Sequence, residues 1–481
     1  MNAIRRFREK YIGDRHFYGY VLAIAIPMIL QNLITNSVSL LDNIMVGRVG
    51  TEQMSGVSIV NQFVFIFNLT MFGGVSGPSI FGAQFYGKKD YEGQKFTFRI
   101  RIILALLVTA IGMTVFFTLD STLIGLYLSK DDAPEVIAAT LSYGREYMRI
   151  IAFSLFPFAI GQAYSSVVRE SGETRIPMIG SLTAVGVNLI LDYGLIFGRL
   201  GLPQMGVAGA ALATVIAKCI EALVVIVWVH THRQRAPYAV GLYKGFHIPG
   251  KLARRVVVKG CPLLVNEFLW SLSVSLVAQC YSTRGLEVVA ARNISSTLVN
   301  LFGVFYVQLG GAIGIIIGAK LGAGKLKEAK DWDNKLLVFS VFMTVIVAVC
   351  MLPVAEAFPY LYNTEPEVRA LATFFVVVQA IAMPIWSFTN ASYFTLRSGG
   401  KTGITFLFDF GFSWGLMIPL AFILAYATDM EIHLMFILVT FSEAVKAVIG
   451  YFMVKSNVWI QNLVEEPSTD GTPEPGSVKT D

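Results

Sequence analysis

Twelve long apolar stretches divide the sequence, and they restrict the possible folds more than any other feature. Each is long enough for an α-helix to cross a hydrocarbon core, which takes about 20 residues. Hydrophobic residues make up 55% of the chain and charged residues only 15%, whereas soluble domains carry about 25% charged residues. A β-barrel would need alternating strands of only about ten residues. We therefore expect an all-α membrane protein with twelve transmembrane helices, at 18–46, 54–82, 97–119, 137–165, 176–198, 205–230, 257–282, 292–319, 335–358, 370–394, 403–427 and 430–455.

Basic residues collect in every second connection between these stretches. The connections that are rich in Lys and Arg include residues 5–15, 88–101, 231–259 and 320–335. Cytoplasmic loops carry most Lys and Arg in membrane proteins, so the pattern predicts a multi-pass plasma-membrane protein with both termini in the cytoplasm. The net charge of +6 is then a topology signal, and we expect no nucleic-acid partner.

Three short segments recur in the two halves of the chain. "PMILQN" (27–32) pairs with "PLLVNE" (262–267), "GAQFYGKKDYEGQK" (82–95) with "GAKLGAGKLKEAKD" (318–331), and "VVRESGETRIP" (167–177) with "TLRSGGKTGIT" (395–405). The three segments follow in the same order and at similar spacing in both halves of the chain, which favours two six-helix lobes. Six is an even number, so the lobes start on the same side and are related by a pseudo-two-fold axis along the membrane normal.

This repeat divides the chain into five parts. We predict a cytoplasmic N-terminal tail at 1–16, an N lobe at 17–230, a cytoplasmic linker at 231–256, a C lobe at 257–456 and a C-terminal tail at 457–481. The last segment is rich in Pro, Gly, Ser, Thr and acidic residues, a composition typical of disorder.

Ionisable residues at membrane depth are rare here, and such residues usually mark ion or substrate paths. Asp42 lies late in the first stretch, where it is either an ion-binding carboxylate or an interfacial cap. Asn188 and Asp192 are four residues apart and so share one helical face, as a Na⁺ or proton site or as a polar clamp between helices. We expect Asp42 and Asp192 to lie together in a dry pocket.

The second half of the chain contains a less clearly defined set of candidate site residues. Glu267 and Asp409 are candidate acidic residues, and the aromatic residues Trp270, Tyr306 and Trp386 are candidates to line a substrate cleft, because aromatic rings attract organic cations. Lipid contact or core packing is the ordinary role of any one aromatic residue. The pairs Lys218/Glu221 and Glu443/Lys446 have a spacing that favours mutual neutralisation.

The sequence gives no indication of an enzyme. Cys219, Cys261, Cys280 and Cys350 fall in or at the edge of apolar stretches and suggest neither a disulfide framework nor a paired metal motif. Nucleotide-binding, nucleophile and metal-ligand motifs are absent from the sequence. We expect no cofactor, and a transmembrane ion gradient as the energy source.

Five segments of the sequence are distinctive in combination: "VSLLDNIMVGRVG" near Asp42, "FGAQFYGKKD", "RESGETRIPM", "VNLILDYGLIFG" near Asp192, and "MGVAGAALATVIA" near Thr214. Through these segments the chain resembles the MATE family, the multidrug and toxic compound extrusion transporters. The resemblance implies export of organic, often cationic, compounds in exchange for H⁺ or Na⁺ by alternating access. It also implies a cation site built from Asp42, Asn188, Asp192 and Thr214.

The second half departs from the family pattern. Some family members have an acidic residue where this chain has Trp386, and their helix 7 glutamate follows its proline by more than the five positions that separate Pro262 from Glu267. Glu267 with Asp409 is the substitute that we expect here.

The functional hypothesis from the sequence is a monomeric efflux antiporter whose partners are small organic molecules and membrane lipid. A lipid-linked oligosaccharide flippase of the same superfamily is one alternative, although few arginines lie at membrane depth. A non-transporting membrane receptor or scaffold is another.

Overall fold

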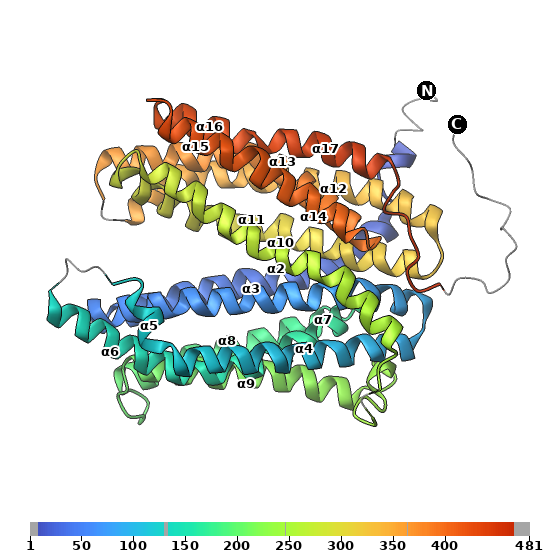
Figure 1. Ribbon diagram of the computed structural model, residues 1–481, viewed down its shortest axis with the longest axis horizontal. Helices are drawn as coiled ribbons and strands as arrows, with labels where there is room; N and C mark the ends of the chain where they lie inside the picture. The colour runs from blue at the N-terminus through green and yellow to red at the C-terminus, as the bar shows by residue number, and fades with distance from the viewer. Residues whose placement is uncertain (1–7, 129–132, 246, 363, 466–481) are drawn as a thin grey trace, which may run out of the picture.

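The computed structural model describes residues 8–128, 133–245, 247–362 and 364–465, apart from the side chains at 39, 40, 43 and 44. Within these residues, twelve helical segments are long and apolar enough to cross a membrane. The predicted all-α class with twelve spans is therefore confirmed. The two lobes lie one above the other in Figure 1, the N lobe in blue to green and the C lobe in yellow-green to red.

The N lobe is built from six spans, and its buried apolar residues form two main clusters. Its helices are α2 (Arg15–Gly47), α3 (Thr51–Lys88), α4 (Tyr91–Thr118), α5 (Asp120–Gly125), α6 (Pro134–Ile151), α7 (Leu155–Glu170), α8 (Arg175–Phe197) and α9 (Val207–Thr231). The fourth span consists of α6 and α7, joined by a single 3₁₀ turn at Ala152–Ser154. The helix α3 has 38 residues and is about 57 Å long at 1.5 Å per residue, so it extends beyond the hydrocarbon core.

The C lobe repeats this plan with two broken spans. Its helices are α10 (Gly250–Ser282), α11 (Leu286–Gly322), α12 (Leu326–Ala357), α13 (Pro366–Ser398), α14 (Thr402–Phe412), α15 (Ile418–Tyr426), α16 (Ile432–Phe441) and α17 (Glu443–Lys455). A π turn at Ser413–Met417 separates α14 from α15, next to Pro419, which has no N–H to donate to the preceding turn. Ser442 separates α16 from α17 and so places Glu443 at the start of a new helix.

The lobes touch at the end of the molecule where α3 ends and α10 begins. A side chain at Gly77 of α3 would lie 2.5 Å from the Cα of Gly260 on α10. Close to this point, Gly87 leaves no room for a side chain beside the Ala319 carbonyl of α11. Glycine is needed at such positions because only it lets two backbones approach so closely.

The helix α2 belongs to both lobes. Its first half, with Phe17, Val21 and Met28, shares an apolar cluster with C-lobe residues of α11 and α12. Its second half packs against α8 of the N lobe. Pro27 lies inside the first half, and a proline inside a helix removes a hydrogen bond and favours bending. The helix α2 can therefore transmit a change in one lobe to the other.

The linker is shorter than predicted and is packed on the N lobe. It runs between Thr231, where α9 ends, and Gly250, where α10 begins, rather than over 231–256. Tyr238 and Leu242 are buried in a cluster with Phe98 of α4. Arg99 donates hydrogen bonds to the carbonyls of Leu242 and His247, both at 2.9 Å.

Residues 457–465, which we expected in a disordered tail, pack across both lobes as a segment that we call the strap. Trp459 is only 1% exposed. Gln84 of α3 donates to the Ser398 carbonyl at 2.9 Å and accepts from the Leu463 N–H at 2.6 Å. The rest of the predicted tail, 466–481, and residues 1–7 of the predicted N-terminal tail lie outside the described residues.

Candidate ion and substrate sites

The structure brings Asp42 and Asp192 together in the N lobe. Asp42 lies on α2 and Asp192 on α8, and their carboxyl groups are close enough to act on each other electrostatically. Asp192 is 1% exposed, and neither of its oxygens has a hydrogen-bond donor among the described residues. Two carboxylates this close repel each other unless a proton or a cation lies between them. The pair can therefore hold one small positive ion.

The side chains of Asn188 and Thr214, which we expected at the same site, differ in their positions and hydrogen bonds. Asn188 lies one turn before Asp192 on α8, is buried, and has a side-chain Nδ2 without a partner among the described residues. Thr214 lies on α9, which packs against α8. Its hydroxyl donates to the Ala210 carbonyl of its own helix at 3.0 Å. No hydrogen bond to Asp42 or Asp192 is found for Thr214 in the described part of the chain.

The ligands around the pair suit a proton or Na⁺ better than a multivalent metal. The carboxyl groups of Asp42 and Asp192 and the amide of Asn188 supply oxygen atoms, and hard cations take oxygen ligands of this kind. The Lys218 ammonium group also acts on Asp42. Across the ranges that the structure describes, no group of three or more His, Cys, Asp or Glu residues is placed to hold a metal ion. A Na⁺ ion at Asp42 and Asp192 would need further oxygen atoms from amide or backbone groups.

Sequence reasoning missed two neighbours of this pair. Tyr147 of α6 is 6% exposed, and the charges of Asp42 and Asp192 both act on its hydroxyl. That hydroxyl donates to the side chain of Asn61 on α3 at 3.3 Å. Neither residue had a signal in the sequence, because an uncharged Tyr or Asn in an apolar stretch has many ordinary roles.

A polar network links α2, α7, α8 and α9 in the same lobe. Gln31 donates to the Ser181 hydroxyl at 2.7 Å and accepts from Arg169 at 3.0 Å. Ser181 in turn donates to Glu221, which is also paired with Lys218 at 2.8 Å. The predicted pairing of Lys218 with Glu221 is thus present, and it is part of a larger network.

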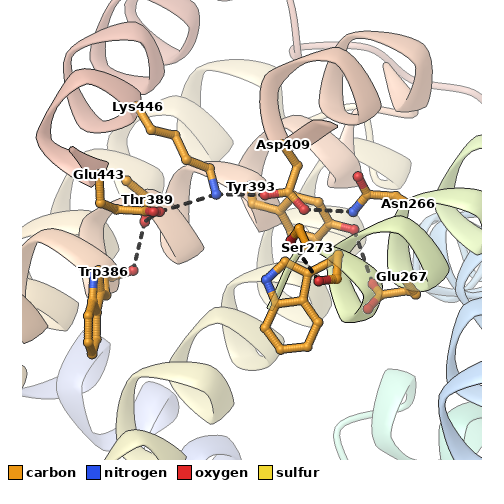
Figure 2. A network of polar contacts seen from close by, with 10 residues as sticks. Asn266, Glu267, Ser273, Trp386, Thr389, Tyr393, Asp409, Glu443 and Lys446 are labelled. Carbon is orange, nitrogen blue, oxygen red and sulfur yellow. Dashed lines mark hydrogen bonds and ion pairs between the residues drawn. The ribbon is translucent and has the colours of Figure 1, made fainter. Parts of the chain in front are cut away.

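In the C lobe, Lys446 holds two carboxylates together (Figure 2). Its Nζ lies 2.6 Å from Asp409 and 3.2 Å from Glu443. Asn266 of α10 donates to the second oxygen of Asp409 at 2.7 Å. Asp409 is therefore fixed by a buried ion pair and an amide, and Lys446 is shared rather than confined to Glu443 as the sequence spacing suggested.

Glu267 lies beside this network without a direct hydrogen bond to Asp409. The Tyr393 hydroxyl donates to Glu267 at 3.4 Å, as Figure 2 shows. Glu267 also faces the N lobe, since a side chain on Gly73 of α3 would lie 3.5 Å from its Cγ. The structure thus brings Glu267 and Asp409 into one region, where only Asp409 has a cationic partner within ion-pair distance among the described residues.

The three aromatic candidates separate into two environments. Tyr306 and Trp386 pack against the same apolar cluster of the C lobe. The Trp386 carbonyl accepts from the Thr389 hydroxyl, which also contacts Glu443 at 3.1 Å. Trp270 is 45% exposed. Tyr306 and Trp386 are therefore close to the charged network, whereas Trp270 faces outward from the packed core.

Two cavities lie near these groups. The first, which we call the central cavity, has a volume of about 140 Å³ and lies between α3 and α7 of the N lobe and α11 and α13 of the C lobe. The second has a volume of about 210 Å³ and is lined mostly by α2, α7, α8 and α9, including Gln31, Lys218 and Glu221. Phe72 and Arg169 line both cavities, so the two spaces adjoin.

Comparison with known proteins gives consistent matches over both lobes. The MatE family profile matches residues 27–194 and 262–423. A probable multidrug resistance protein NorM of Thermotoga maritima is 22% identical over 406 residues, covering 84% of this chain and 85% of the relative. The multidrug resistance protein PmpM of Pseudomonas aeruginosa is 25% identical over 84% of this chain and 83% of its own.

Solved structures show the same fold. A crystal structure of a MATE protein in complex with MaL6 has a TM-score of 0.80 with this chain at 17% sequence identity, covering 91% of this chain and 95% of the other. The predicted two-lobe arrangement is thereby confirmed.

Proposed function

The chain belongs to the MatE family, and from this premise we propose that it is a secondary active antiporter that exports organic, often cationic, compounds in exchange for H⁺ or Na⁺. It is a multi-pass membrane protein and a transporter rather than an enzyme. Its relatives NorM and PmpM are named as multidrug resistance proteins. We also propose that it works as a monomer in the plasma membrane with both termini in the cytoplasm.

One observation supports the coupling mechanism: the carboxyl groups of Asp42 and Asp192 lie close enough to act on each other electrostatically. An ion that enters from outside neutralises the pair, whereas its loss leaves two like charges that repel each other. Because Asp42 lies on α2, whose first half packs against the C lobe, a shift of α2 changes the fit between the lobes. Ion binding and lobe movement are then linked equilibria.

An ion-exchange experiment tests which cation drives transport. The protein is reconstituted into proteoliposomes, and ethidium transport is followed under an imposed pH gradient and, separately, under a Na⁺ gradient. Transport under only one gradient identifies the coupling ion. Absence of transport under both gradients would contradict the antiport proposal and favour a receptor or scaffold.

The role of Asp42 is tested by D42N, which keeps the shape of the side chain and removes its charge. We expect the ion-driven rate to fall at least about tenfold, since one member of the exchanging pair can no longer bind a cation. The matched control is E135Q, because Glu135 is an exposed acidic residue at the start of α6. Wild-type rates in D42N, with expression unchanged, would refute the role of Asp42.

A further inference from the structure

The acidic pair Asp42/Asp192 and a second pair of polar residues lie on the same faces of α2 and α8. Gln31 of α2 donates to the Ser181 hydroxyl of α8 at 2.7 Å. Asp42 follows Gln31 by eleven residues on α2. The same number of residues separates Ser181 from Asp192 on α8. Eleven residues make about three helical turns, so the two pairs lie at two levels of the N lobe, about 16 Å apart.

Lys218 of α9 lies between these two levels. The span α9 follows α8 directly and crosses the membrane in the opposite direction. Glu221 belongs to the level of Ser181, from which it accepts a hydrogen bond. Lys218 precedes Glu221 by three residues and is therefore nearer to the level of Asp42. The Cα–Cβ bonds of a helix are tilted toward its N-terminus, so the stem of Lys218 starts in the direction of the acidic pair.

Lys218 has an acidic neighbour at each level. Its Nζ lies 2.8 Å from Glu221, and its charge also acts on Asp42. The ring of Phe158 lies 5.5 Å from Nζ. Lys218 and Glu221 both line the second cavity, whose volume of about 210 Å³ leaves the flexible four-carbon stem of a lysine room to change rotamer. The ammonium group is therefore paired with one carboxylate and has space to move toward another.

Glu221 keeps other partners when Lys218 moves away. The Ser181 hydroxyl donates to Glu221, and the guanidinium charge of Arg169 acts on it. The acidic pair has no comparable support, since neither oxygen of Asp192 has a hydrogen-bond donor among the described residues. Two carboxylates that lie close together repel each other when no cation is present. Loss of the coupling ion therefore attracts Lys218 to the acidic pair more strongly than Glu221 retains it.

We propose that Lys218 is an internal counter-ion that takes the place of the coupling ion at the acidic pair. When H⁺ or Na⁺ occupies the pair, Lys218 is bound to Glu221. When the ion leaves, the ammonium group moves to Asp42, so that a positive charge stays beside the pair in both states. Lys218 remains protonated throughout and acts as a positioning residue of the coupling site. This inference rests on the proposed antiport function and adds a competitor for the coupling ion.

The test measures how tightly the protein holds its coupling ion when Lys218 is changed. Ethidium transport by proteoliposomes is followed at increasing concentrations of H⁺ and, separately, of Na⁺. In K218Q the half-saturating concentration of the driving ion is expected to fall at least about tenfold, because the competing charge is gone. The maximal rate should also fall, since ion release is no longer assisted. K218R, which keeps the charge, should restore most of both values.

A second variant predicts a change of opposite sign. E221Q removes the other carboxylate partner of Lys218, so the ammonium group should compete more strongly at Asp42 and the half-saturating ion concentration should rise. Disturbed packing alone would not move K218Q and E221Q in opposite directions. K251Q, which changes an exposed lysine of α10, is the matched control and should keep the wild-type value. An unchanged or raised half-saturating concentration in K218Q would refute the proposal.

Ion binding to the purified full-length protein separates this proposal from the proposed function. Uptake of H⁺ is followed with a pH-sensitive dye in weakly buffered solution, and binding of Na⁺ with the radioactive ion. The double variant K218Q/E221Q, which removes both charges of the ion pair, replaces K218Q if that variant does not fold. If the wild type transports nothing, the antiport function fails, while tighter ion binding without Lys218 still supports the counter-ion. If the wild type transports ethidium and the variants bind the ion as it does, the antiport function stands and the counter-ion is refuted.

Discussion

At the scale of single residues, Lys446 decides the charge balance of the C lobe. It contacts Asp409 and Glu443, and all three lie within helices that cross the membrane. A buried ion pair adds little net stability, but loss of one partner leaves a buried charge uncompensated. The network therefore depends more on Lys446 than on either carboxylate.

We expect K446M to lower the free energy of unfolding by about 3–5 kcal/mol. The change is measured as a fall in the thermal unfolding midpoint of the purified protein. K455M is the matched control, because Lys455 is an exposed lysine of the same helix, α17, and its effect should stay within about 0.5 kcal/mol. The double variant K446M/D409N should recover part of the lost unfolding free energy. Equal effects of K446M and K455M would contradict the role of Lys446 as the partner of the two carboxylates.

At the scale of elements, Asp120 joins the short helix α5 to α6. It is 5% exposed and contacts Arg145 at 3.2 Å and Arg149 at 3.0 Å. Burial by itself raises the pKa of Asp120, but hydrogen bonds from Ser121 and from the two arginines outweigh burial and the net pKa is lowered. The arginines are about half exposed, with side chains 41% and 53% exposed, so solvent weakens the ion pairs.

This lowered pKa predicts the pH dependence of one contact. A carboxylate with a lowered pKa in the folded state contributes stability above its unfolded pKa of about 3.9 and loses that contribution as the pH falls through its folded pKa. We therefore expect D120N to be less stable than the wild type by about 1–2 kcal/mol between pH 5 and 8. The difference should shrink as the pH falls below the unfolded pKa and vanish once the pH lies below the lowered folded pKa. Thermal unfolding across the acidic range is the measurement, and a constant difference at all pH values would count against this prediction.

At the scale of the whole molecule, the strap at 457–465 connects the lobes where they touch. Gln84 and Lys88 of the N lobe bond to Leu463 and Val464, and Gln84 also bonds to Ser398 of the C lobe. The alternating access that we propose requires this end to open, so these contacts would break during the proposed transport cycle.

Deletion of residues 457–481 should therefore shift the population toward a state open at this end. Spin labels are placed at position 89, directly after α3, and at position 327, near the start of α12. They report the distance between these two helix ends on a background in which Cys261 and Cys350 are replaced because both are exposed. We expect a larger fraction of long distances in this deletion. Deletion of 466–481 alone keeps the strap and is the control; identical distance distributions in the two deletions would show that the strap does not hold the lobes together.

Much of the fold was predictable because the hydrocarbon core imposes a length on each helix. The twelve apolar stretches correspond to the twelve spans, and the repeat indicated two lobes. The breaks at Ser413–Met417 and Ser442 were not predicted, since hydropathy is the same on both sides of each break. The strap was missed because its apolar residues, among them Trp459, Leu463 and Val464, form a run too short to predict a transmembrane span.

For the sites, the sequence by itself determined which few charged residues stand in apolar surroundings, because such residues are rare at membrane depth and each is visible in one dimension. Asp42, Asp192, Glu267 and Asp409 were all found in this way. Only the tertiary structure decided which of them meet. Asp42 pairs with Asp192 across α2 and α8, Asp409 pairs with Lys446, and Lys218 has an acidic neighbour on two different helices, because the rotation and contact of helices are set by packing between surfaces far apart in the chain.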